Sequence, residues 1–224
     1  MRYLLHADGK DHGHHRKRVS RMKTIAVLAS GRGSNFQAIL DSIAAHRINC
    51  RCVALITDNM EAYAIERAKK AGVPVIVHHF WDYPSKEAYE EDLLNSMRQT
   101  GADLFLCAGY MRIVGAKITD TFAGRMMNIH PALLPAFPGL HAQRQALAYG
   151  AKVAGCTVHF MDSGLDSGPI IVQKTVPVLD GDDEDTLADR ILEQEHIAFS
   201  EAVGLFCDGR LRIEGRHVRI LPQN

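Results

Sequence analysis

What the sequence lacks already excludes several classes of protein. No apolar run approaches the roughly 20 residues that a bilayer-spanning helix needs, so no membrane partner is predicted. Lys and Arg total 26, and Asp and Glu also total 26, so no overall charge favours nucleic acid. The five cysteines contain no CxxC pair, so a zinc ribbon is not indicated. We interpret them as reduced thiols, which places the protein in the cytoplasm.

The first 22 residues differ in composition from the rest of the chain. They contain six of the 26 Lys and Arg, two of the 26 acidic residues and four of the 12 His. No apolar stretch of signal-peptide length accompanies this basic character, so the segment is not a secretory signal. We predict that residues 1–22 are a disordered leader, or a non-native one translated upstream of a true start at Met22, in preference to a metal site.

From Lys23 onward, short apolar runs alternate with segments of helical periodicity. The predicted strands are 24–29, 52–57, 74–78, 104–108 and 125–129. The predicted helices are 35–45, 61–71, 85–100 and 118–122. This alternation predicts an α/β fold with a Rossmann-like, mostly parallel, doubly wound sheet. With 224 residues and 46% hydrophobic content, the chain can bury a sizeable core.

After Pro131 the pattern changes. A Pro- and Gly-punctuated stretch, 131–141, precedes a short predicted helix at 143–149. Two β-rich stretches, 154–161 and 169–177, flank a polar loop, and an amphipathic helix over 184–206 follows. We therefore divide the predicted domain 23–224 into halves at residue 130.

One candidate site is the turn Ser30–Asn35, which joins the first predicted strand to the first helix. Its glycines let the backbone approach a ligand, and free N–H groups at a helix start suit a phosphate. A dinucleotide fingerprint needs a third Gly where Phe36 stands, although Asp58 follows the second strand as such a site requires. A nicotinamide site is thus weakened but stays open, as does a simple tight turn.

A second candidate site combines Asn128 and His130 with a distant carboxylate. Residues two apart on a strand share a face, so this amide and imidazole can point into one crevice. Crevices at the carboxyl ends of parallel strands bind ligands in this fold class. Asp166, before Ser-Gly-Pro, supplies a carboxylate from a turn. Taken singly, a structural His and a solvated turn Asp are the simpler interpretations.

Four segments together carry a family resemblance: GRGSNFQAIL (31–40), AGYMRIV (108–114), MNIHPALLPAFPGLHAQRQAL (127–147) and GCTVHFMDSGLDSGPI (155–170). In this order they closely resemble the glycinamide ribonucleotide formyltransferases, over about residues 23–212. The resemblance implies a formyltransferase-type α/β fold. It also implies transfer of a formyl group from 10-formyltetrahydrofolate to the amine of glycinamide ribonucleotide, a step of purine synthesis. No metal is required, and the oligomeric state is open, a homodimer included.

The resemblance also implies residue roles. Asn128 and His130 would stabilise the oxygen of a tetrahedral intermediate, while Asp166 would hold His130 protonated. The implied nucleotide-binding residues, in the half 23–130 and on the last helix, are Gly33, Ser34, Asn35 and Glu195. The implied folate-binding residues are Lys86, Met111, Arg112, Ile113, Val114, Asn128, Asp162, Ser163, Gly164, Leu165 and Asp166, and the half 131–224 is the folate half.

Further details follow from the same resemblance. His141 and His159 match positions near the site, and Leu134–Pro135 is expected to be cis. Two positions depart from the family pattern. Lys86 stands where some relatives carry Arg, which keeps the charge but loses a bidentate contact. Leu192 stands where some carry Gln near the ribose.

Other activities remain as alternatives. A formyl-folate hydrolase would carry a regulatory domain before this one, and a formyltransferase acting on initiator tRNA would carry a basic domain after it. We expect neither, since 22 residues precede Lys23 and the chain ends soon after its last long helix. A nicotinamide oxidoreductase or a non-catalytic nucleotide-binding module conflicts with the missing third Gly and with the Asn–His–Asp set.

Overall fold

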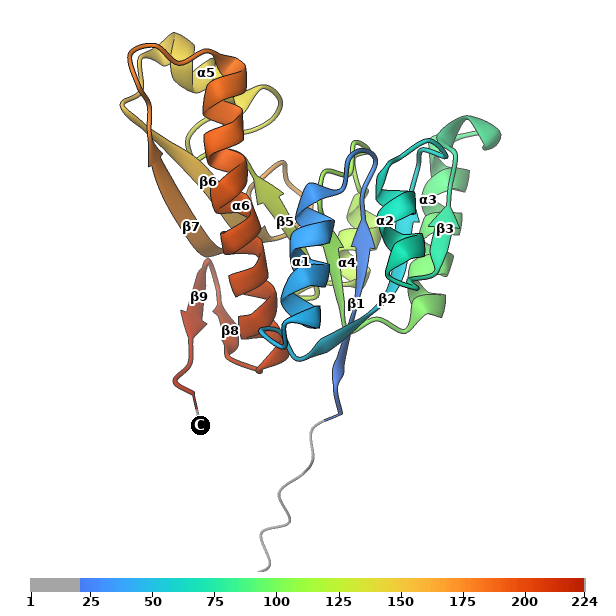
Figure 1. Ribbon diagram of the computed structural model, residues 1–224. Helices are drawn as coiled ribbons and strands as arrows, with labels where there is room; N and C mark the ends of the chain where they lie inside the picture. Colours follow the sequence, from blue (N-terminus) through green and yellow to red (C-terminus); the bar gives the residue numbers. More distant parts are fainter. Residues whose placement is uncertain (1–20, 224) are drawn as a thin grey trace, which may run out of the picture.

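The computed structural model describes residues 21–223, in which a nine-stranded sheet is flanked by helices (Figure 1). The strand order is β3-β2-β1-β4-β5-β6-β7-β9-β8. The strands are β1 Lys23–Leu28, β2 Cys50–Thr57, β3 Val75–Val77, β4 Leu104–Cys107, β5 Met126–His130, β6 Val153–Phe160, β7 Ile170–Pro177, β8 Leu211–Glu214 and β9 His217–Ile220. The helices are α1 Ser34–Ala44, α2 Ala64–Lys70, η1 Phe80–Asp82, α3 Lys86–Thr100, α4 Ala116–Thr121, α5 Ala142–Tyr149 and α6 Glu184–Cys207.

Strands β3, β2, β1, β4 and β5 run parallel, which confirms the predicted mostly parallel, doubly wound sheet. The sheet then changes direction, because β6 pairs antiparallel with β5 and β7 pairs antiparallel with β6. The two β-rich stretches after residue 150 therefore extend the first sheet. β5 is the border between its parallel and antiparallel parts.

Alternate residues of each strand enter two different cores. On one face, Ile129 of β5 and Val158 of β6 belong to the core that contains Phe199 of α6. On the other face, Met126 of β5 belongs to the core that contains Leu93 of α3. Since side chains two apart share a face, Asn128 and His130 point away from the α6 side. This alternation decides where the polar residues of β5 emerge.

Local signals set most element ends. Ser85 caps α3, with its hydroxyl accepting a bond from Ala88 N at 3.1 Å, and Gly101 ends the helix in the left-handed region, as predicted. The second helix starts three residues later than predicted. Asn59 instead forms a turn, accepting from Glu61 N through its side chain and from Ala62 N through its carbonyl. The expected cis bond between Leu134 and Pro135 is confirmed.

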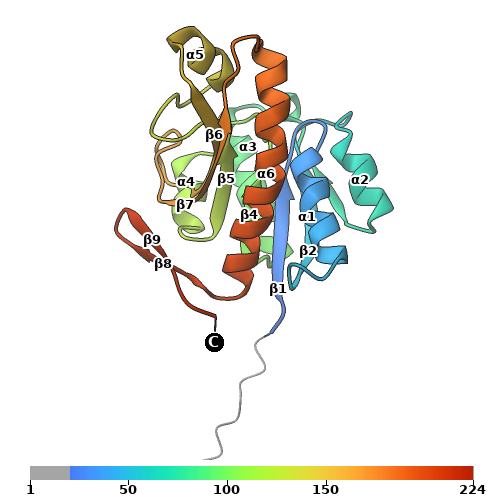
Figure 2. The same cartoon turned by 60° about the vertical axis from the view of Figure 1, so that its left-hand side comes forward.

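Two elements, the short helix η1 and the hairpin β8–β9, were not predicted from the sequence. The hairpin projects from the sheet beside the end of α6 (Figure 2). Gly215 and Arg216 join its two strands. The hairpin pairs with the rest of the sheet where His217 of β9 lies opposite Ile170 of β7. Alternating apolar residues over 211–220 around a Gly-containing turn were the available signal.

Candidate active site

Asn128 and His130 emerge at the border strand β5. Asn128 pairs with Cys107 of β4 and with His159 of β6 in the sheet register. The side chain of His130 is buried, whereas Asn128 is partly exposed. An amide and two imidazoles therefore project from adjacent strands on one face of the sheet.

Asp166 reaches this face from the loop after β6. Its carboxylate lies 3.4 Å from Nδ1 of His130 and 3.8 Å from Nε2 of His159, and it accepts a bond from Gly139 N at 2.8 Å. The residue has a φ of 48°, a left-handed conformation that Asp tolerates better than most side chains. The carboxylate thus joins β5, β6 and the 131–141 loop.

Both ring nitrogens of His130 face oxygen acceptors. Nδ1 faces Asp166, and Nε2 lies 2.8 Å from the carbonyl oxygen of Phe137. A ring that carries two N–H groups satisfies both contacts, so the surroundings match the charged imidazolium. The buried ring of His130 thus lies between two oxygen acceptors, beside the partly exposed amide of Asn128.

His159, the second imidazole on this face, has contacts that match a neutral ring. Its Nδ1 donates to the carbonyl oxygen of Phe160 at 2.8 Å, which leaves Nε2 as an acceptor for Nδ2 of Asn128 at 3.4 Å. Burial lowers the pKa of His159, opposed by the Phe160 carbonyl and by the Asp166 carboxylate. A neutral His159 therefore orients the amide of Asn128.

The phosphate-type turn adopts the predicted geometry. Gly33 has a φ of 67° and directly precedes α1, and a Cβ there would lie 2.8 Å from Cβ of Ala64. Only glycine fits this position without strain. Ser34 and Asn35 are the first two residues of α1, and the first backbone N–H groups of a helix have no partner within the helix.

Asn35 and Glu195 meet each other, although the sequence separates them by 160 residues. Nδ2 of Asn35 donates to Glu195 at 2.8 Å, and both side chains are buried. Burial raises the pKa of Glu195, opposed by the Asn35 hydrogen bond and by the charge of His130. The structure thus brings Glu195 into the electrostatic environment of the Asn–His–Asp set.

The segment 110–114 follows β4. Met111 and Ile113 are strongly exposed, and Val114 packs against the α3-side core. The guanidinium of Arg112 is bound by Asp58 at 2.9 Å. Lys86, at the start of α3, lies 3.5 Å from Glu90.

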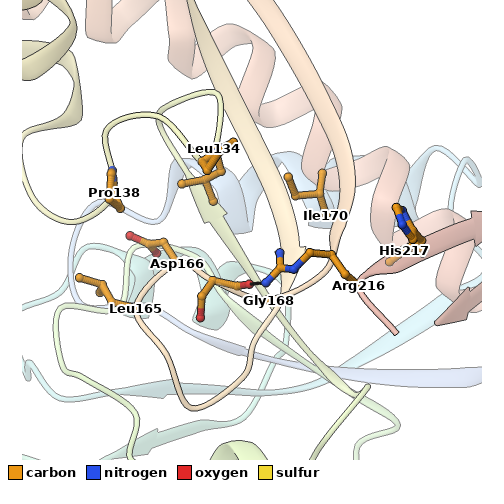
Figure 3. A pocket seen from close by; sticks show the side chains of 11 residues that line it. Leu134, Pro138, Leu165, Asp166, Gly168, Ile170, Arg216 and His217 are labelled. Atoms are coloured by element: carbon orange, nitrogen blue, oxygen red, sulfur yellow. Dashed lines mark hydrogen bonds between the residues drawn. The ribbon is translucent and has the colours of Figure 1, made fainter. Parts of the chain in front are cut away.

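A cavity of about 680 Å³ lies beside Asp166 (Figure 3). It is lined by the 131–141 loop, by the loop between β6 and β7, and by the β8–β9 hairpin. Leu134, Pro138, Leu165 and Ile170 give it apolar walls. In Figure 3, Arg216 extends from the hairpin to the 165–168 loop, where it donates to the carbonyl oxygen of Ser167. In the same connection between β6 and β7, Asp162 accepts bonds from Gly164 N and from the Ser167 hydroxyl.

A family model described as formyl transferase matches residues 23–203. The chain belongs to the formyl transferase family. It is 45% identical over 202 residues to a phosphoribosylglycinamide formyltransferase of Mycobacterium tuberculosis, a match that covers 88% of this chain and 93% of that protein. A solved structure of glycinamide ribonucleotide transformylase 1 from Symbiobacterium toebii matches with a TM-score of 0.88 and 52% identity, covering 90% of this chain and 95% of that one.

The chain is also similar to part of a much longer relative. It is 45% identical over 192 residues to the trifunctional purine biosynthetic protein adenosine-3 of Drosophila pseudoobscura pseudoobscura. This match covers 85% of the present chain but 14% of the relative's length. Together the matches confirm the family resemblance that the four sequence segments carry.

Several contacts of this formyl transferase domain were not expected from its sequence. The backbone groups of Phe137 and Gly139, which hold His130 and Asp166, carry no side-chain signal. His141 occupies the N-cap position of α5 without a side-chain cap hydrogen bond, and its Nδ1 lies 3.6 Å from the Glu184 carboxylate. Within residues 21–223, no helix is long and apolar enough to cross a membrane. The same residues form no group of three or more His, Cys, Asp or Glu that could hold a metal ion.

Proposed function

We propose that this chain is a phosphoribosylglycinamide formyltransferase. It would transfer the formyl group of 10-formyltetrahydrofolate to the amine of glycinamide ribonucleotide, giving the N-formyl product and tetrahydrofolate in purine biosynthesis. The observation that carries the proposal is the cluster of Asn128, His130 and Asp166 beside a phosphate-type helix start. The similarity to the phosphoribosylglycinamide formyltransferase of Mycobacterium tuberculosis, of which the match covers 93%, supports it.

The proposed chemistry is direct transfer. The substrate amine attacks the formyl carbon, and the carbonyl oxygen becomes an oxyanion. Asn128 and His130 donate to that oxygen, and each such donor is typically worth about 3–4 kcal/mol in the transition state. Asp166 keeps His130 in its charged form. A proton passes from the attacking amine to the leaving folate nitrogen through His130 or an ordered water.

This role requires one local change. Nε2 of His130 is occupied by the Phe137 carbonyl, so the 131–141 loop must release it before the ring can donate to the formyl oxygen. Phe137 has a φ of 53°, which is strained for a bulky residue. Relief of that strain would favour the release.

The two substrates are assigned to different segments. The nucleotide would bind at Gly33, Ser34 and Asn35, with Glu195 meeting its glycinamide end. The folate would bind along Met111, Arg112, Ile113 and Val114, with Lys86 near its acidic tail. The 162–166 loop would lie against its pterin through Asp162, Ser163, Gly164, Leu165 and Asp166.

The division into halves at residue 130 is part of this proposal, as are the cytoplasmic location and a homodimer among the oligomeric states. The predicted leader, residues 1–22, lies outside the described residues except for Arg21 and Met22.

Absorbance of the folate during incubation tests the proposal. A spectral change that needs both 10-formyltetrahydrofolate and glycinamide ribonucleotide supports transfer. The same change without the nucleotide would identify a formyl-folate hydrolase instead. Light scattering of the same preparation gives the oligomeric state.

A further inference from the structure

Asp58 is a buried acid that the proposed chemistry does not use. It follows β2, where a nicotinamide-binding site would place a carboxylate for the ribose. Here the Ser30 hydroxyl donates to one of its oxygens, and Nε of Arg112 donates to the other at 2.9 Å. Asp58 is 7% exposed, so its carboxylate is committed to these two partners.

Ser30 ties together the ends of three parallel strands. It follows β1, its N–H donates to the Gly109 carbonyl after β4, and its own carbonyl accepts from Asn59 after β2, both at 3.1 Å. Its hydroxyl also accepts a bond from Met111 N at 2.8 Å. The residue that opens the phosphate-type turn is thus fastened to the segment that carries the predicted folate contacts.

Arg112 is held on a second side by aromatic rings. Its guanidinium carbon lies 4.3 Å from the centre of the Phe80 ring and 5.8 Å from that of Trp81. The side chain therefore points inward, between Asp58 and the aromatic pair. Met111 and Ile113, on either side of it, are 68% and 76% exposed. Fixing Arg112 fixes the direction in which these two residues project.

We propose that Asp58 is a positioning residue for the folate cosubstrate: by binding Ser30 and Arg112 together, it holds the 110–114 segment in its folate-binding conformation. This inference rests on the proposed function. It assigns to Arg112 an internal contact with Asp58, so the folate meets the backbone and the two exposed neighbours of Arg112. It also accounts for an acid at the end of β2 without a nicotinamide.

The test replaces Asp58 with Asn, which keeps an acceptor for Ser30 but puts an amide against the guanidinium. Losing a charged hydrogen bond should raise KM for 10-formyltetrahydrofolate about tenfold. KM for glycinamide ribonucleotide and kcat should stay within about threefold, because the Asn side chain still accepts from Ser30 and so keeps the phosphate-type turn in place. Trp81 is the only tryptophan in the sequence, so its emission spectrum reports on the displaced guanidinium.

Asp82→Asn is the matched control, since it removes the same charge next to Trp81 from a side chain that is 71% exposed. It should leave both KM values unchanged. Arg112→Met should reproduce the folate effect, and the Asp58→Asn, Arg112→Met double variant should lose no more than either single variant. Additive losses would mean that Arg112 contacts folate directly and would overturn the proposal.

A merely structural Asp58 would give a different pattern. The substitution would then lower Tm, raise both KM values together and leave the Trp81 emission equal to that of the control. That result, or an unchanged KM for the folate, would refute the positioning role. Failure of the proposed function would instead appear in the unsubstituted enzyme, which would transfer no formyl group. In that case, quenching of Trp81 by tetrahydrofolate, compared between Asp58→Asn and Asp82→Asn, still decides the positioning role.

Discussion

At the scale of single residues, the site depends on which atoms already have partners. His130 stands between the Asp166 carboxylate and the Phe137 carbonyl, and both contacts are to oxygen. Its neighbour His159 donates from one nitrogen and accepts at the other. Two imidazoles on one sheet face thus differ in their hydrogen-bond partners. His130 has an oxygen acceptor at each ring nitrogen, whereas His159 meets the Asn128 amide at Nε2.

The first prediction concerns the catalytic set. His130→Ala should lower kcat about 100- to 1000-fold with little change in nucleotide binding, because the ring acts in the transition state. Asp166→Asn should also lower kcat strongly, since the charged ring loses its carboxylate. The two losses should not add in the double variant, because the groups act as one unit. Steady-state kinetics measures all three, and Asp180→Asn, which changes a 96% exposed side chain, is the control. Near-normal turnover in either single variant would refute this mechanism.

The second prediction concerns Asn35. Asn35→Ala should raise KM for glycinamide ribonucleotide more than KM for 10-formyltetrahydrofolate, since it removes a contact at the non-reacting end. The hydrogen bond to Glu195 strengthens this expectation, because the substitution also strips a buried carboxylate of its donor. Initial rates with each substrate varied in turn give both constants. A larger effect on the folate constant would contradict the assignment of this turn.

The third prediction follows from the raised pKa of Glu195. Burial makes the folded state hold this proton more tightly than the unfolded state does. Stability is therefore lost as the pH rises from about 4.5 through the folded-state pKa. Glu195→Gln should raise Tm relative to the unsubstituted protein more at pH 7.5 than near pH 4.5. Thermal unfolding at both values measures this, with the exposed Glu193→Gln as control. If the gain in Tm at pH 7.5 is equal to or smaller than the gain at pH 4.5, burial of the ionised Glu195 carboxylate does not destabilise the fold.

At the scale of elements, several residues predicted to contact the substrates lie at the first turn of a helix. Ser85 caps α3 directly before Lys86, and Gly33 directly precedes α1. Both ends follow from local sequence, since a hydroxyl before a helical pattern and a glycine in a turn are short-range signals. The start of α2 was missed because the Asn59 turn competes with the helical pattern. The hairpin β8–β9 was missed because its strands have four residues each.

The fourth prediction tests one of these ends. Ser85→Ala should destabilise the fold by about 1 kcal/mol, because Ala88 N loses its acceptor. Ser85→Asp should preserve stability, since Asp caps helices equally well. Urea unfolding of both variants provides the measurement. Equal destabilisation by Asp and by Ala would show that the cap bond is not the cause.

At the scale of the whole molecule, the site lies where the parallel sheet turns antiparallel. Asn128 and His130 come from the last parallel strand, His159 comes from the first antiparallel one, and Asp166 follows it. α6 covers the opposite face, so loops close the site on this side. Loops can release a contact such as that of Phe137 more readily than a packed helix could.

The fifth prediction concerns the start of the chain. A protein beginning at Met22 should retain near full turnover, because β1 begins at Lys23. Of the described residues it loses Arg21, whose side chain is 71% exposed and binds Asp103 at 2.8 Å. Asp103 keeps its bonds from Thr24, so the loss in stability should be small. Turnover and Tm of the shortened chain are the measurements. A folded but inactive product would refute the prediction.

The sequence by itself determined the alternation of strands and helices, the glycine turn, the caps and the membership of a family. These features depend on neighbours within a few positions, or on motifs read directly. Tertiary structure alone decided that Asn35 meets Glu195, that the Phe137 carbonyl contacts Nε2 of His130 and that Asp58 binds Arg112. Each of these contacts joins side chains or backbone groups brought close by sheet pairing and loop closure. Strand period fixes which face a residue takes, but only the order of strands fixes what lies opposite it.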